Sequence, residues 1–160
     1  MRIAYLLSVW VHVVAAIVWI GGMCFLALAL VPTLRRPEMR PVSTKLIHLL
    51  GIHFRKIGWI CLGLLILTGF SNLFLRGLSW ENIRNLSVLR AKLSLVGLIL
   101  ILSLFHDFIV GPRATAALQA DSLSLEAQRW RWRASWMGRI TLFLALVAVT
   151  LGILFSRGGF

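Results

Sequence analysis

Four histidines are the residues of this sequence best suited to bind a metal or a cofactor. His12 lies inside a long apolar run, His48 and His53 lie in the segment after that run, and His106 lies near the end of a third apolar block. Ionisable groups inside a membrane are costly and usually mark a site. Each histidine is therefore a candidate ligand for haem iron, copper or zinc, or else a residue that forms only a hydrogen bond between helices.

His12 has surroundings that favour a cofactor. Ala15, Ala16 and Trp19 follow it at i+3, i+4 and i+7, so they share its helical face. Small residues beside a histidine let a flat macrocycle approach the helix while the imidazole supplies an axial ligand. The spacing predicts a haem site at His12 with Trp19 on the same face, and a histidine that bonds only a neighbouring helix is the alternative.

A stripe of the third apolar block carries further polar groups at helical spacing: Lys92, Ile99, Ser103, His106 and Arg113. The stripe predicts that His106 faces the bundle and that Lys92 lies at the depth of His12. A cation at that depth, Lys92 or the nearby Arg90, can pair with a haem propionate, or it can extend to the lipid headgroups.

The three remaining histidines predict a second, separate site near the other membrane boundary. His106 should meet His48 and His53 there, with Asp107 adjacent. Nitrogen and carboxylate ligands suit copper, zinc or haem iron. The alternative is contact with headgroups or loop carbonyls, because the spacing of His48 and His53 does not place them on one helical face.

Apolar blocks at about residues 3–31, 57–75, 89–110 and 139–156 must position these side chains. Each is close to the length needed to cross a hydrocarbon core of roughly 30 Å at 1.5 Å per residue. With 59% hydrophobic residues in 160, a soluble domain is excluded. We predict an all-α polytopic membrane protein, one four-helix transmembrane domain over residues 1–160, and we find no internal repeat.

The formal net charge of +12 comes from basic residues between the blocks, so lipid and not nucleic acid is the expected partner. Eleven of the 17 basic residues lie on one side: Arg35, Arg36, Arg40, Lys45, Arg55, Lys56, Arg113, Arg129, Arg131, Arg133 and Arg139. Basic loops stay in the cytoplasm. The asymmetry predicts a bacterial cytoplasmic membrane protein with both termini on the outer side.

Tryptophan and arginine alternate in the segment before the fourth block. Trp130, Trp132 and Trp136 are interleaved with Arg129, Arg131 and Arg133. Aromatic and basic residues together are typical of a helix at the membrane surface. This pattern predicts an interfacial anchor.

Several blocks resemble a known family. The run from His12 through Trp19-Ile20-Gly21-Gly22 to Met23 resembles the first helix of the copper-resistance D (CopD-like) membrane family. Phe54 to Trp59, Leu67 to Leu73 and His106 to Arg113 resemble its next two helices. The first run and Arg90-Ala91-Lys92-Leu93 are also similar to the HemJ-type protoporphyrinogen oxidases. That resemblance implies a four-helix haem b protein, with His12 as the haem histidine and Lys92 as the matching lysine.

Three functions follow as hypotheses. The preferred one is a haem b-binding membrane protein of the CopD-like superfamily with a redox or electron-transfer role, and by resemblance to the HemJ type it could be a membrane oxidoreductase. The second is copper transport or tolerance through His12, Met23 and Cys24. The third is a metal-free accessory subunit. A small bundle of this kind is expected to form a homo-oligomer.

Overall fold

The computed structural model describes residues 2–77 and 87–157, and that part of the chain contains helices and no strands. The first helix, α1 (Arg2–Phe25), continues through a π-helical turn, η1 (Leu26–Leu30), into α2 (Val31–Leu34). A 3₁₀ turn, η2 (Pro37–Met39), leads into α3 (Arg40–Leu75). The second half contains α5 (Ser87–Phe105), η3 (His106–Val110), α6 (Gly111–Ala120) and α7 (Leu125–Ser156).

Four helices are long and apolar enough to cross a membrane, as the hydropathy blocks predict: Arg2–Leu34, Val42–Leu75, Ser87–Ala120 and Leu125–Ser156. Each has 32 to 34 residues and is about 50 Å long, more than the roughly 30 Å of hydrocarbon. The first helix was expected to end near Val31 but runs to Leu34, since Pro32 fits at the start of α2. A helix longer than the hydrocarbon core tilts or extends into the headgroup layers.

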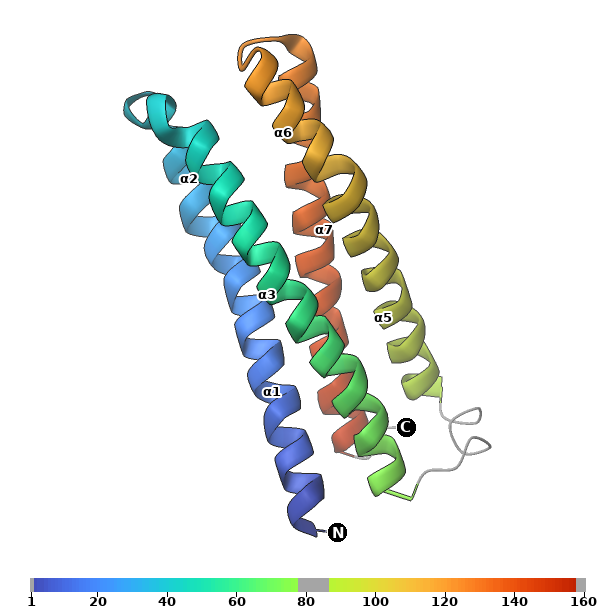
Figure 1. The fold of residues 1–160 in the computed structure, drawn as a ribbon. Helices are drawn as coiled ribbons and strands as arrows, with labels where there is room; N and C mark the ends of the chain where they lie inside the picture. Colours follow the sequence, from blue (N-terminus) through green and yellow to red (C-terminus); the bar gives the residue numbers. More distant parts are fainter. Residues whose placement is uncertain (1, 78–86, 158–160) are drawn as a thin grey trace.

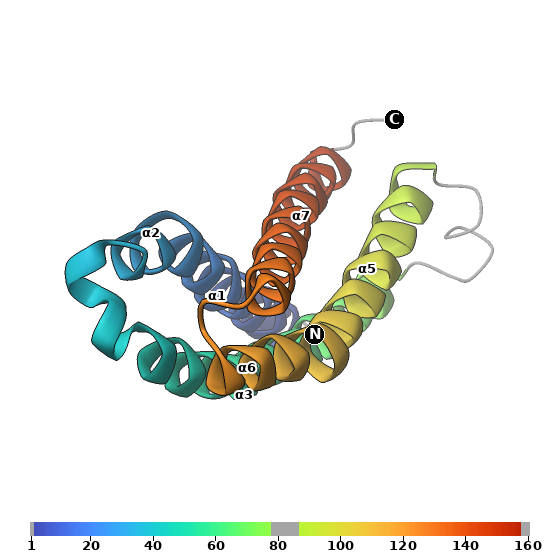
Figure 2. The ribbon, with the colours of Figure 1, turned by 90° about the horizontal axis from the view of Figure 1, so that it is seen from above.

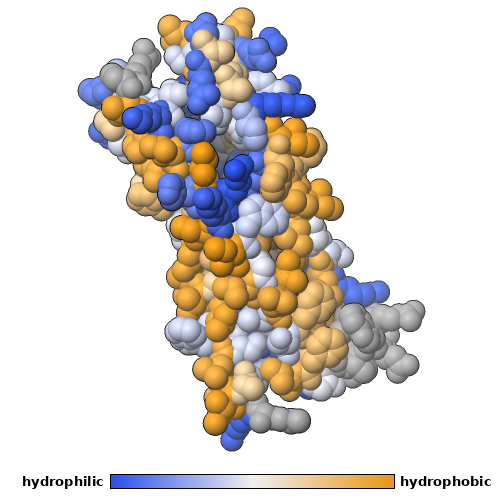
Figure 3. Space-filling view, viewed as in Figure 1, coloured by the Kyte–Doolittle hydropathy of each residue, from blue (hydrophilic) through white to orange (hydrophobic). Residues whose placement is uncertain are grey.

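Large apolar side chains cover the outside of these helices. Leu28 is 77% exposed, Ile3 is 75% exposed, and Leu67 and Ile17 are similarly open. Figure 3 shows hydrophobic residues over most of the lower two thirds of one face and hydrophilic residues gathered toward the upper end. So much exposed apolar surface requires lipid around it. The chain is an integral membrane protein.

The helices form two antiparallel pairs. α1 packs along α3, α5 packs along α7, and the pairs meet mainly through α1 with α7 and α3 with α6 (Figures 1 and 2). α1 begins and α7 ends at one end of the bundle, called the terminal end below, and the α2–α3 and α6–α7 connections lie at the other, the loop end. The core takes residues from all four spans: Ala15, Trp19, Cys61, Leu62, Ile99 and Ala145.

The two helix pairs have corresponding features at a constant offset in residue number, which the sequence analysis did not predict. The π-helical turns at residues 26–30 and 106–110 are 80 positions apart, as are Pro32 and Pro112. A proline lacks an N–H and its ring clashes with the carbonyl four residues earlier, so the preceding turn widens. The N–H groups of Val31 and Gly111 accordingly bond carbonyls five residues back. In this register His12 corresponds to Lys92.

Candidate functional site

His12 is held by a hydrogen bond to the neighbouring helix. Its Nδ1 lies 2.8 Å from Thr68 Oγ1, and the Thr68 hydroxyl itself donates to the Leu64 carbonyl at 2.5 Å. A hydroxyl has one hydrogen to donate. Because that hydrogen goes to Leu64, the tautomer that satisfies both contacts is the one in which His12 Nδ1–H donates to Thr68. The neutral imidazole then carries its free electron pair on Nε2.

Lys92 reaches the same level from the second helix pair. Its ammonium is close enough to interact electrostatically with His12 and with Arg76. Gly152 of α7 makes room for it, since a Cβ built there would lie 3.1 Å from Lys92 Nζ. Gly69 of α3 lies beside His12, where a built Cβ would be in ordinary van der Waals contact at 3.6 Å from Cε1. All four spanning helices therefore meet around His12 and Lys92, at the depth predicted from the stripe.

Arg76 and Tyr5 close this group toward the terminal end. Arg76 Nε donates to Tyr5 Oη at 2.7 Å, and the guanidinium lies over the rings of Tyr5 and Phe155. We call His12, Thr68, Lys92, Arg76 and Tyr5 the terminal-end cluster. It brings two cations and one imidazole together where the described residues supply no carboxylate partner.

Two unsatisfied polar atoms lie one helical turn from the His12–Thr68 pair. Ser8 Oγ precedes His12 by four residues, and Asn72 Oδ1 follows Thr68 by four. Both atoms are buried and have no hydrogen-bond partner. Buried polar atoms are normally bonded, so a bound group or water near them is the ordinary explanation.

The other residues predicted at this site lie elsewhere. Trp19 is only 6% exposed and packs against Gly58 in the core, about two turns from His12. Arg90 is exposed at the start of α5, because two positions turn it roughly 200° around the helix from Lys92. Sequence reasoning missed Thr68, Arg76 and Tyr5. Their only signal was a polar side chain within or at the end of a span.

A second polar group surrounds Asp107 in η3, nearer the loop end. His106 Nδ1 donates to Asp107 Oδ1 at 2.8 Å and Trp59 Nε1 donates to Oδ2 at 3.0 Å. Arg55 donates to the Asp107 carbonyl at 3.1 Å and lies over the Phe108 ring. We call these five residues the loop-end cluster. It ties α3 to the widened turn of the third span.

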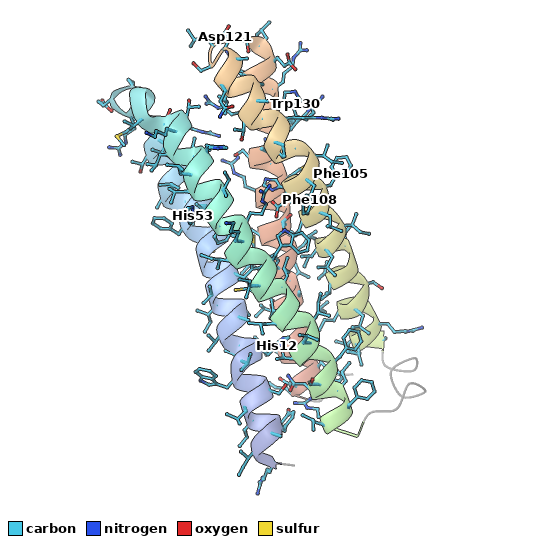
Figure 4. All side chains as sticks on the ribbon, in the orientation of Figure 1. His12, His53, Phe105, Phe108, Asp121 and Trp130 are labelled. Atoms are coloured by element: carbon cyan, nitrogen blue, oxygen red, sulfur yellow. The ribbon has the colours of Figure 1, made fainter. Side chains whose placement is uncertain are left out.

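His48 and His53 do not complete a metal site with His106. His53 is exposed and its Nδ1 donates to Leu49 O of its own helix, and His48 is half-buried on α3. Figure 4 shows His53 and Phe108 nearer the loop end than His12. Within residues 2–77 and 87–157, no three His, Cys, Asp or Glu side chains are grouped as a metal ion would require.

The two clusters lie at different depths, as the sequence predicted for His12 and His106. On α3 they are marked by Thr68 and Trp59, nine residues apart, or about 14 Å of helix. One iron cannot bind both histidines at this separation.

Comparison with known proteins places the chain in a family. Residues 14–123 match the family described as Domain of unknown function (DUF4149). The chain is also 30% identical over 154 residues to an uncharacterized protein of Aquifex aeolicus (strain VF5), covering 95% of each chain. No solved structure matches it. The matched region contains Lys92, Thr68 and the whole loop-end cluster, and the chain therefore belongs to the DUF4149 family.

Proposed function

We propose that this chain is a haem b-binding membrane protein of the CopD-like superfamily with a redox or electron-transfer role. His12 would hold the haem iron through Nε2, and Lys92 would pair with a propionate. The observation that carries the proposal is the His12–Thr68–Leu64 hydrogen-bond chain, which favours the tautomer with Nε2 unprotonated. Metal-binding histidines usually donate their other N–H in this way.

The donor set of the terminal-end cluster fits haem b. One neutral imidazole supplies a ligand nitrogen, and two cations with no carboxylate partner among the described residues match an anionic propionate. His12 and Lys92 come from different helix pairs, so a group bound between them would be held by both. The iron would supply one-electron chemistry. Thr68 would orient the imidazole and Lys92 and Arg76 would favour the more negatively charged state of a neighbouring group.

The copper hypothesis has less support from the geometry. Met23 packs against the core beside Trp19, eleven residues from His12, or about 16 Å along the helix. Cys24 is a free, half-buried thiol next to it. These side chains and His12 are too far apart for one ion. Copper binding and a metal-free accessory role are therefore alternatives that the experiment on haem binding also tests.

That experiment is an absorption spectrum and metal analysis of one purified sample, made in cells supplied with haem. The proposal expects a Soret band, iron near one per chain and little copper. His12→Ala should lose most of the haem and stay in the membrane, whereas His53→Ala is the matched control and should keep it. Iron retained by the His12→Ala protein, or copper in place of iron, contradicts the proposal.

We also propose the membrane and its orientation. The chain lies in a bacterial cytoplasmic membrane, the basic loop end faces the cytoplasm and both termini face outward, because the eleven basic residues between the paired spans outnumber the six elsewhere. A homo-oligomer is part of the same proposal.

A further inference from the structure

A groove on the outside of the second helix pair has one apolar end and one cationic end. It has a volume of about 550 Å³, is open to the surroundings, and lies between η3 with its flanking residues and α7. Phe105, Ile109 and Ile140 line the apolar end, and Arg113, Trp130 and Arg133 line the other. Figure 4 shows Trp130 nearer the loop end than Phe105, so the polarity of the groove follows the bundle axis.

The two arginines of the groove are positioned by one indole ring. The guanidinium of Arg113 lies 5.4 Å from the Trp130 ring centroid, and that of Arg133 lies 4.9 Å from it. Stacking on an aromatic face restrains a guanidinium and leaves its N–H donors open to an anion. Among the described residues neither arginine pairs with a carboxylate, and no acidic side chain lines the groove.

The groove is long enough for the phosphate and the upper part of an acyl chain of a lipid that lies parallel to the helices. From Arg113 back to Phe105 is eight residues, or about 12 Å, and from Arg133 to Ile140 is seven residues, or about 10 Å. The cationic end lies beside the tryptophans typical of the headgroup layer, and the apolar end lies toward the hydrocarbon. A phospholipid with its phosphate at the cationic end and an acyl chain at the apolar end would match both ends of the groove.

We propose that this groove is a binding site for an anionic phospholipid. Arg113 and Arg133 bind the headgroup phosphate, and Phe105, Ile109 and Ile140 contact an acyl chain. The charge of the groove distinguishes this occupant from a zwitterionic lipid, whose ammonium group would meet two guanidiniums. The site is independent of the proposed haem site, which lies in the interior at the terminal end.

The test is native mass spectrometry of the purified protein titrated with phosphatidylglycerol or phosphatidylcholine. The wild-type protein should retain phosphatidylglycerol in preference. Arg113→Gln with Arg133→Gln should weaken that binding by about 30-fold, because each arginine near an anionic surface favours binding by roughly five- to sixfold. Arg129→Gln with Arg131→Gln is the matched control, since both arginines are exposed on α7 and line no part of the groove.

Three results would overturn the proposal. Equal losses in the groove variant and its control would mean general attraction to the basic surface. Equal retention of both lipids would mean no recognition of charge, and displacement of the lipid by excess inorganic phosphate would mean that only an anion binds. Met137→Trp, which fills the groove without changing charge, should also release the lipid. If the double arginine variant does not have the helix content of the wild type, lipid binding by Met137→Trp decides the test instead.

Discussion

His12 and Thr68 form a hydrogen bond of 2.8 Å between α1 and α3, and Thr68 in turn donates to its own helix. Thr68→Val keeps the shape of the side chain and removes the acceptor. Loss of a partner for a fully buried N–H costs about 1–3 kcal/mol, an upper bound for the part-buried His12, and loss of the residue that orients a ligand histidine lowers metal affinity roughly 10- to 100-fold.

We therefore expect Thr68→Val to bind haem 10- to 100-fold more weakly, measured by titration of the apoprotein with haem and the Soret absorbance. Thr68→Ser, which keeps the hydroxyl, should bind like the wild type. Wild-type affinity in the valine variant would show that the hydrogen bond does not orient a ligand.

This pair also shows what the sequence could and could not predict. Hydropathy and helical spacing are local signals, so they predicted four spans and the depth of Lys92 relative to His12. The hydrogen-bond partner of His12 depends on the register of α1 against α3. That register could not be predicted, because one lipid-facing apolar residue can replace another without changing the hydropathy pattern. For the same reason, the hydropathy pattern did not reveal that the two helix pairs have corresponding positions. Pro32 and Pro112 are the main sign of that correspondence in the sequence.

The second prediction concerns the tight contact between Gly22 of α1 and Phe54 of α3. A Cβ added at Gly22 would overlap the ring of Phe54, whereas one at Gly21 meets nothing within 4 Å. Gly22→Ala should lower stability by about 1–3 kcal/mol, the usual cost of overpacking, and so reduce the melting temperature in detergent. Gly21→Ala should be neutral or slightly stabilising. Adding Phe54→Leu to Gly22→Ala should restore part of the lost melting temperature. If it restores nothing, the loss does not come from contact with the Phe54 ring.

The third prediction concerns Asp107, which accepts hydrogen bonds from Trp59 and His106. Asp107→Ala leaves both donors without their partner at about 1–3 kcal/mol each, so we expect a clear fall in melting temperature. Asp107→Asn keeps an acceptor oxygen for one donor, so its melting temperature should fall less. Glu38→Ala, at an exposed acidic residue, is the control and should have little effect. A fall no larger than that of Glu38→Ala would mean that water replaces the carboxylate.

The fourth prediction concerns orientation. A reporter that is active only outside the cytoplasm should work when fused after Phe160 and fail when inserted after Asp121, in the α6–α7 connection at the loop end. The reason is the basic excess near that connection, which the positive-inside rule assigns to the cytoplasm. A reporter specific for the cytoplasm should give the reverse pattern at both positions. The opposite result would show that charge does not set the topology of this chain.

The fifth prediction separates the two clusters. His106 already donates to Asp107, and its cluster lies about 14 Å along α3 from that of His12. A single haem with both histidines as axial ligands would require them to reach one iron from opposite faces. We therefore expect His106→Ala to keep the haem content and the spectrum, whereas His12→Ala removes both, measured as haem per chain and as the oxidised and reduced absorption maxima. Partial losses with different spectra in the two variants would reveal a second haem at the loop end. Conversion of one six-coordinate haem to a five-coordinate form by either substitution alone would mean that the two helix pairs slide along each other by most of that 14 Å.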